Sequence, residues 1–395
     1  MRRPLVLSLS ILFSLTSACG GESVPRLSDI EPTTRGGGAP GPEGPRGEPG
    51  PAGPAGQYAR IKVVPPGSTP EESGENLRAA LAAIRSPSAD EPWLIFLEPG
   101  VYELGGEALH LRPFVYLQGA GAGLTTVRSH SAEPTFVAAA DTEVGALTVE
   151  NMGGSPHAVA LSTPSANFRA RDVVALAHDG VERTVAIVSW GVPGAPDSRG
   201  VEFTHARAVA NSAQGVVKGF DCQDCSVRLA SSSFLAQGGG QAFGVAVHSG
   251  SLEVWDSSAE GLKGTEESIG VDARGSSHVS LMRAEARGTQ GPVSTGVRLS
   301  SSTATVRDST LAGTGLAGHQ TRALDVSRVA RLTYRVDVER STLVGGTQVV
   351  RGAEGYSIFI GGSQLRGGQV EGNGMVACHG SYDENFTSPP APACP

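Results

Sequence analysis

The chain has 395 residues, a net charge of −8, 54 glycines, 26 prolines and only 5% aromatic residues. The acidic balance excludes a nucleic-acid partner, because phosphate binding needs a concentrated positive field. So few aromatic residues exclude a large aromatic core. Small residues must then pack closely, which favours a repetitive architecture.

The first residues predict export. Arg2 and Arg3 precede an apolar run, Leu5–Leu15, which is too short to span a bilayer and is typical of a secretory signal. The run closes with "LTSAC", which resembles the bacterial lipoprotein signal, although Thr16 stands where that pattern usually has leucine. The resemblance implies lipidation of Cys19 and an anchor in the outer membrane, at the cell surface. Ordinary cleavage nearby is the alternative.

A stretch rich in glycine and proline follows the signal. Gly38–Gly56 has glycine at every third position and resembles collagen, in which only glycine fits the crowded axis of three chains. We favour a stiff single-chain spacer, which would extend to about 60 Å at ~3.1 Å per residue. The alternative is a stalk through Gly38–Gly56 that joins the chain into a homotrimer.

A helix and two strands are predicted after the spacer. "STPEESGENLRAALAAI" has Thr69 or Ser73 as the N-cap and an apolar face that ends at Ile84. "WLIFLEPGVYEL" and "PFVYLQGAGAGLTTV" are apolar strands separated by glycine. This trio resembles the start of pectin-lyase-like right-handed β-helix proteins. The resemblance implies that the helix covers the open end of the coil, where strand edges would otherwise pair with another chain.

A repeated pattern occupies the rest of the domain. Similar strand segments begin at Leu147, Phe168, Val201, Val227, Leu252, Val279, Ala304, Val336 and Ile358. A second strand precedes most of the later ones, as in "GVAV" at Gly244, "GVDA" at Gly270, "GVRL" at Gly296 and "ALDV" at Ala323. The nearly constant period with two strands per repeat predicts an all-β, parallel β-helix, and the resemblance to pectin-lyase-like proteins implies that it is right-handed.

Side-chain alternation divides each repeat into inner and outer positions. In the frame that starts at Ala304, the first, third, sixth and eighth residues should point inward, as Ala304, Val306, Ser309 and Leu311. The fifth position should form a corner of the coil, because its polar residues bond nearby backbone in turns. It is held by Asn151, Asp172, His205, Ser231, Asp256, Arg283, Asp308, Arg340 and Gly362.

The outward second and fourth positions supply the candidate site. The second position alternates as Arg169, Glu202, Arg228 and Glu253, which predicts a ladder of cross-strand charge pairs. In the fourth position, Trp255 beside Met282 is the one exposed apolar spot expected on this face. Tryptophan beside guanidinium and carboxylate groups can stack against a sugar and hydrogen-bond to it. The carbohydrate-binding candidates are Arg171, Arg228, Glu253, Trp255 and Arg307.

No catalytic motif, metal site or cofactor site is predicted. Gln223–Asp224 weakly resembles the Gln-Asp pair of pectin methylesterases, but the surrounding pattern is missing. One CxxC supplies only two of the four ligands that zinc needs. Apart from Cys19 the cysteines are even in number, so we expect disulfides Cys222–Cys225 and Cys378–Cys394 in an exported chain.

These expectations divide the chain into a lipoprotein signal peptide (1–18), a Gly/Pro-rich collagen-like linker (19–57), a β-helix (58–375) and a disulfide-closed tail (376–395). We predict a non-catalytic surface lipoprotein, structural or adhesive, that binds polysaccharide on the outer face of the helix. One alternative is a polysaccharide lyase or pectin-esterase-like enzyme with a cleft at the long connections 173–201 and 311–336. The other is a trimeric, fibre-like assembly protein.

Overall fold

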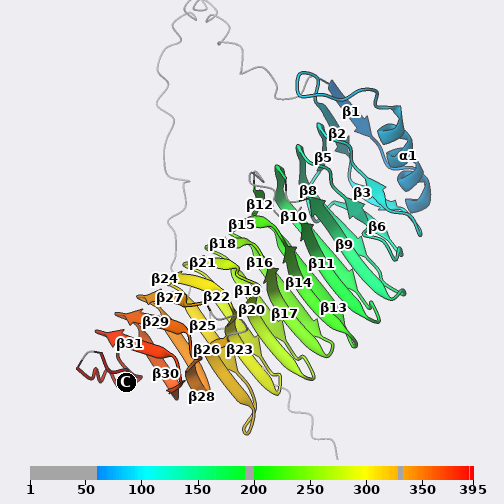
Figure 1. Cartoon of the computed structure of the whole chain (residues 1–395). Helices are drawn as coiled ribbons and strands as arrows, with labels where there is room; N and C mark the ends of the chain where they lie inside the picture. Colours follow the sequence, from blue (N-terminus) through cyan, green and yellow to red (C-terminus); the bar gives the residue numbers. More distant parts are fainter. Residues whose placement is uncertain (1–59, 165, 192–199, 328–331, 391) are drawn as a thin grey trace, which may run out of the picture. The chain divides into compact units, whose positions relative to one another are not determined.

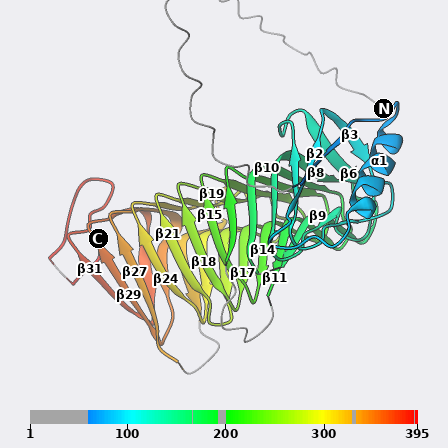
Figure 2. The same ribbon diagram turned by 90° about the horizontal axis from the view of Figure 1, so that it is seen from above.

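The computed structural model describes residues 60–164, 166–191, 200–327, 332–390 and 392–395. The predicted signal peptide, the lipidated Cys19 and the Gly38–Gly56 stretch lie outside these residues. The described chain is a parallel β-helix in which strands of successive coils pair in register. Its coils are stacked in a row, with the helix α1 at one end and the C-terminus at the other (Figures 1 and 2).

Three parallel sheets form the walls of the helix. Sheet 1 contains β1 (Arg60–Val64), β2 (Trp93–Leu97), β5 (Val115–Gly119), the first parts of β8 (Thr142–Asn151) and β10 (Phe168–His178), β12 (Val201–Thr204), β15 (Ser226–Ala230), β18 (Ser251–Trp255), β21 (His278–Met282), β24 (Thr303–Arg307), β27 (Tyr334–Glu339), β29 (Tyr356–Gly361) and β31 (Met375–His379). Sheet 2 contains β3 (Gly100–Glu103), β6 (Thr125–Ser129), the second parts of β8 and β10, β13 (Arg207–Ser212), β16 (Ser233–Gly238), β19 (Ser258–Leu262), β22 (Glu285–Thr289), β25 (Thr310–Thr314) and the first parts of β28 (Thr342–Gly352) and β30 (Gln364–Gly372). Sheet 3 contains β4 (Leu109–His110), β7 (Phe136–Val137), β9 (His157–Pro164), β11 (Arg183–Trp190), β14 (Val216–Gln223), β17 (Gln241–His248), β20 (Glu267–Arg274), β23 (Val293–Ser300), β26 (Gln320–Ser327) and the second parts of β28 and β30.

The predicted fold class is confirmed, and so are the inward columns. Ala304, Val306, Ser309 and Leu311 are all buried, and Val306 pairs with Leu281 before it and Val338 after it. Like residues therefore stack from coil to coil, at the spacing of about 4.8 Å between paired strands.

The number of strands per coil was predicted wrongly. Each later coil has three strands, because the repeated segment divides at its fifth residue into a strand of sheet 1 and a strand of sheet 2. "GVAV", "GVDA", "GVRL" and "ALDV" lie in the strands of sheet 3, as expected of a separate strand. A single residue makes the corner between sheets 1 and 2, so the two strands look like one in the sequence.

The alignment of the segment at Leu147 was also wrong. Thr142 pairs with Phe168, and Leu147 pairs with Val173 in sheet 2. The corner of this coil is therefore Ala146, with φ +51°, and Asn151 is a buried residue at the end of β8. The error arises because apolar alternation continues on both sides of the corner, so the sequence fits either frame.

Sheets 2 and 3 approach each other so closely that glycine is required between them. A Cβ on Gly288 of β22 would lie 2.1 Å from the carbonyl oxygen of Ser268 in sheet 3. A Cβ on Gly296 of β23 would lie 2.6 Å from the backbone nitrogen of Ala312 in sheet 2. The high glycine content therefore reflects backbone packing across the interior.

The helix α1 (Pro70–Ala83) covers the N-terminal end, as predicted. Thr69 is the N-cap and accepts from the N–H of Glu72 at 3.2 Å, whereas Ser73 lies inside the helix. Leu77 and Ile84 are buried in the core cluster that fills the coil. The Arg78 guanidinium donates to the carbonyl of Leu104 at 3.0 Å, which ties α1 to the chain after β3.

The tail folds back over the last coils. β31 pairs with β29, and Cys378 is joined to Cys394. The rings of Tyr382 and Phe386 stack at 5.4 Å between their centroids. Both predicted disulfides are confirmed, since Cys222 is joined to Cys225.

Candidate functional site

The corner between sheets 1 and 2 is built from residues with left-handed backbone. Their φ values lie between +46° and +54° in every coil from Asp172 to Gly362. The corner residues are Asp172, His205, Ser231, Asp256, Arg283, Asp308, Arg340 and Gly362. The predicted turn at the fifth position is therefore confirmed for these residues. The turn directs each side chain away from the core.

A ladder of serines beneath the corner satisfies the backbone that the turn frees. Ser309 Oγ accepts from the N–H of Ala284 in the preceding coil at 3.0 Å and donates to the carbonyl of Arg307 at 2.6 Å. The same pair of bonds recurs where Ser257 Oγ accepts from the N–H of Ser232 and donates to the Trp255 carbonyl. Buried backbone groups need such partners, which explains serine at the sixth position.

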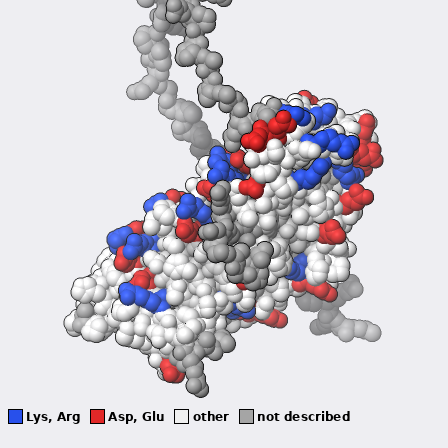
Figure 3. Space-filling view, turned by 45° about the horizontal axis from the view of Figure 1, so that its top comes forward, with Lys and Arg blue, Asp and Glu red and all other residues white. Residues whose placement is uncertain are grey.

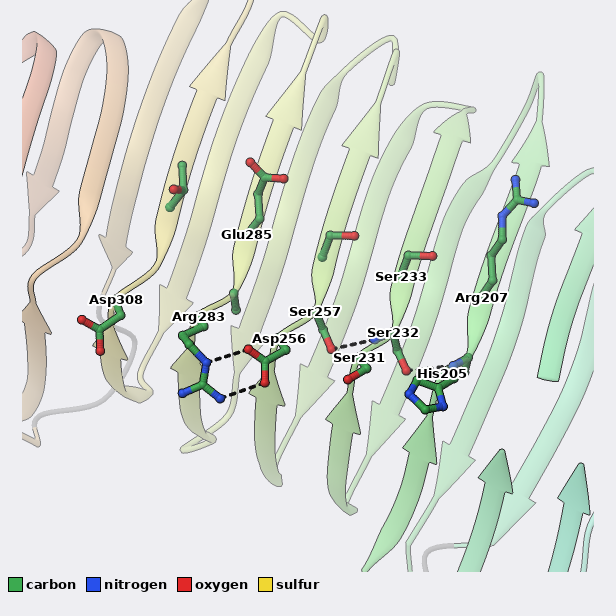
Figure 4. Close-up of a pocket in the computed structure, with 14 residues that line it drawn as sticks. His205, Arg207, Ser231, Ser232, Ser233, Asp256, Ser257, Arg283, Glu285 and Asp308 are labelled. Carbon is green, nitrogen blue, oxygen red and sulfur yellow. Dashed lines mark hydrogen bonds and ion pairs between the residues drawn. The ribbon is translucent and has the colours of Figure 1, made fainter. Parts of the chain in front are cut away.

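The outer side of this corner is hollowed into an open groove of about 790 Å³. Its floor is made of small residues, and its rims carry charged and hydroxyl groups (Figure 4). The lining includes His205, Arg207, Ser231, Ser233, Asp256, Ser258, Arg283, Glu285, Asp308 and Thr310. We call this surface the corner groove. It follows the stacking direction of the coils, so a ligand in it would meet a new set of polar groups about every 4.8 Å.

Paired charges repeat along the corner groove and just beyond its end. Arg283 donates to both carboxylate oxygens of Asp256, at 2.6 and 2.8 Å, from one coil to the next (Figure 4). Arg340 makes the same two bonds to Asp308, both at 2.8 Å. These bonds lower the pKa of the Asp256 and Asp308 carboxyl groups below the ordinary value. The two carboxylates are therefore ionised, with both oxygens bonded to an arginine. They can accept hydrogen bonds but have no proton to donate.

Trp255 lies on sheet 1 directly before the corner residue Asp256. Its ring is partly buried rather than exposed, and the Arg283 guanidinium lies 6.0 Å from the ring centroid. The indole Nε1 is buried and has no hydrogen-bond partner among the described residues. Trp255 therefore supports the rim of the corner groove through Arg283 and presents only part of its ring to solvent.

The outer face of sheet 1 carries the predicted charge ladder. Arg169, Glu202, Arg228 and Glu253 are paired strand to strand. Arg228 and Glu253 form an ion pair at 3.0 Å, and together with Arg169 and Glu202 they line a cavity of about 380 Å³. Positive and negative groups are interspersed on the surface in Figure 3, with no large region of one sign in that view.

The five predicted carbohydrate-binding residues share this face but are not gathered in one cavity. Arg228 and Glu253 line the cavity described above, and Trp255 adjoins the corner groove. Arg171 forms an ion pair with the half-buried Glu143 at 3.9 Å, and Arg307 forms an exposed ion pair with Glu339 at 3.2 Å. The corner residues Asp256 and Arg283 were predicted only as turn formers. Opposite charges at the same position of neighbouring repeats were the signal that could have identified them as a pair.

Sheet 3 holds a second polar surface that the sequence analysis did not identify. Asp221, Asp272 and Asp325 are buried, and each lies between two cations. The pairs are Asp221 with Arg183 and Lys218, Asp272 with Arg274 and Arg298, and Asp325 with Arg322 and Arg351. Asp221 and Asp272 line a cavity of about 420 Å³ beside Phe243. Carboxylates paired on two sides fit a rigid structural network better than proton transfer.

Neither a metal site nor a spanning helix is found in the described part of the chain. No group of three or more His, Cys, Asp or Glu side chains there could hold a metal ion. Gln223 and Asp224 lie within the turn that the Cys222–Cys225 bridge closes. Among the residues that the structure describes, no helix is long and apolar enough to cross a membrane.

Comparison with solved structures finds several chains that resemble this one at low sequence identity. The chain is similar to the Dettilon tailspike protein gp208 (TM-score 0.49, 9% identity, 78% of this chain and 68% of that one). It is also similar to the catalytic unit of a GH87 α-1,3-glucanase from Streptomyces thermodiastaticus (TM-score 0.42, 15% identity, 85% and 67%). A third similar structure is the pectin methylesterase PemA from Erwinia chrysanthemi (TM-score 0.27, 11% identity, 85% and 92%). No family model matches the sequence, and no curated protein does.

Proposed function

We propose that this protein is a non-catalytic surface lipoprotein, anchored to the outer membrane through Cys19, that binds an extended polysaccharide along the corner groove. The observation that carries the proposal is the continuity of the groove over several coils, with hydroxyl groups and paired charges repeated on its rims. A polymer with a short chemical repeat can place the same groups against successive coils. The groove is open and shallow enough for such a polymer to enter from the side.

The character of the carboxylates supports binding without cleavage. Glycoside hydrolysis needs one carboxylic acid that donates a proton and one free carboxylate across the bond. In the corner groove, Asp256 and Asp308 are each held by both oxygens in a bond to arginine. Their ion pairs give a sugar several hydrogen-bonding groups of fixed direction, and neither aspartate holds a proton that it could donate to a leaving oxygen.

The test is retention and cleavage of a panel of acidic and neutral polysaccharides by the soluble protein. Arg283→Gln removes one partner of the Asp256 pair and the cation beside Trp255, so retention of the bound polymer should fall at least about tenfold. Trp255→Ala should weaken retention as well. Trp190→Ala is the matched control, because Trp190 is 44% exposed on sheet 3 and lies outside the groove.

Two results would contradict the proposal. One is that no polysaccharide is retained by the wild-type protein. The other is cleavage of a polysaccharide that Asp221→Asn or Asp272→Asn abolishes, which would place an active site on sheet 3 and favour the enzyme hypothesis. Anchoring is tested separately by labelling cells with radioactive palmitate, where Cys19→Ser should remove the label.

A further inference from the structure

An apolar patch lies on the outer face of sheet 1 at its N-terminal end. Ile61 and Val63 of β1 are 62% and 48% exposed. They pair with Leu94 and Phe96 of β2, and Leu94 pairs with Tyr116 of β5. Strand alternation places these five side chains on the outer face, because Ile95 and Leu97 between them lie in the core. Ile61 and Val63 are exposed, Phe96 and Tyr116 are half-buried, and Leu94 is buried beneath its neighbours. We call this surface the N-terminal apolar patch, and it contains Ile61, Val63, Leu94, Phe96 and Tyr116.

The patch differs from the rest of the same face. In later coils the corresponding outward positions hold the Arg169–Glu202–Arg228–Glu253 ladder, which is stable in water. The prediction that Trp255 is the one exposed apolar spot on this face was therefore wrong. Two exposed apolar side chains beside half-buried Phe96 and Tyr116 form an apolar surface of the kind found at protein contacts.

The backbone at this end is also open. Within the described residues, β1 pairs with β2 on one side and with no strand on the other. The helix α1 packs mainly on β3 and reaches β1 with only a few residues. A free edge beside an apolar patch offers both backbone hydrogen bonds and apolar area to a partner.

We propose that the homotrimer alternative holds for Gly38–Gly56, and that the N-terminal apolar patch packs against the same patch of the two further copies that these triplets bring together. The triplets end at Gly56, four residues before β1 begins at Arg60, so the connecting chain reaches at most about 14 Å. A triple helix at Gly38–Gly56 would therefore place three such patches around one axis, where each can contact its neighbours. Because the triplets end so close in sequence to β1, another copy of this chain is the occupant we propose.

The test measures the mass of the full chain by sedimentation equilibrium in detergent. Ile61→Ser with Val63→Ser should raise the concentration at which the trimer dissociates by at least about tenfold, because both side chains lose buried area in all three copies. The matched control is Val181→Ser with Leu316→Ser, since these residues are 55% and 69% exposed elsewhere on the β-helix. The control should dissociate within about twofold of the wild type. Deletion of Gly38–Gly56 should also promote dissociation, because it removes the tether.

The proposal is overturned if the wild-type chain is a monomer, or if the patch variant and its control dissociate alike. It is also overturned if the deletion has no effect on mass. Flotation of the Cys19→Ser chain with phosphatidylglycerol vesicles, lost in the patch variant, would assign the patch to the membrane instead. Urea unfolding of the patch variant should match the wild type, because both substituted residues are exposed at a strand edge.

Discussion

Replacement of Ser309 by alanine tests the serine ladder beneath the corner. Ser309 Oγ accepts from the buried N–H of Ala284 and donates to the carbonyl of Arg307. The side chain is only 5% exposed, so water cannot replace the hydroxyl. An unpaired buried N–H costs about 1–3 kcal/mol, so we expect Ser309→Ala to lower the free energy of unfolding by about 2 kcal/mol.

The ladder also offers a substitution in the opposite direction. In the ladder, the serine at the sixth position of one coil accepts from the N–H at the sixth position of the coil before it. Ala284 holds the sixth position in the coil after Ser257, so the N–H of Ser257 has no serine hydroxyl to bond to. Ala284→Ser would add an acceptor where Ser309 shows that one fits. We expect a gain of about 1 kcal/mol, which is the usual net value of an added hydrogen bond.

Urea unfolding, followed by circular dichroism, measures both changes in the free energy of unfolding. Each appears as a shift of the urea midpoint while the dependence of the free energy on urea concentration stays the same. Ser280→Ala is the control, because Ser280 lies at an outward second position of sheet 1. It should remain within about 0.5 kcal/mol of the wild type. If Ser309→Ala is as mild as Ser280→Ala, the corner does not depend on the ladder and this reasoning is refuted.

Three further predictions concern the tail, the groove and the glycine packing. Replacing Cys378 and Cys394 by serine removes a disulfide whose cysteines are separated by 16 in the sequence, which should lower the free energy of unfolding by about 3 kcal/mol. The variant should unfold at a lower temperature, and adding reductant should not lower that temperature further. The pKa of Asp256 is lowered in the folded state, so the ion pair with Arg283 stabilises the protein fully above pH ~4. This stabilisation is lost as the pH falls through the lowered pKa. In Asp256→Asn, the free energy of unfolding should therefore fall less steeply with decreasing pH below pH ~4 than in the wild type. Gly288→Ala should cost about 3 kcal/mol in urea unfolding, whereas Gly361→Ala, whose Cβ meets nothing within 4 Å, should cost far less.

The sequence predicts the stacking of the coils well because burial acts on each strand in the same way. Val306 and its partners must be apolar in every coil, so the pattern is visible without any structure. The closed turn at Cys222–Cys225 and the helix that begins at Thr69 follow from equally local rules.

The surfaces were harder to predict because they depend on which coils lie side by side. Asp256 and Arg283 are 27 residues apart, and only their shared position at the corner makes them a pair. Asp221 and Arg183 are 38 residues apart, and they meet because β11 and β14 are neighbours in sheet 3. Ile61 is exposed because its strand lies at the end of the stack of coils. The local sequence pattern does not show which strand occupies that end.

The single-residue turn at the corner separates what holds the coil together from what the coil displays. The turn needs only a residue that tolerates positive φ with a serine or another small residue behind it, and aspartate, histidine, serine, arginine and glycine all serve there. Substitutions at these sites can change which functional groups line the groove while the backbone of the coils stays the same. A lineage of such proteins could therefore acquire new ligands by exchanging one outward residue per coil, without passing through an unfolded ancestor.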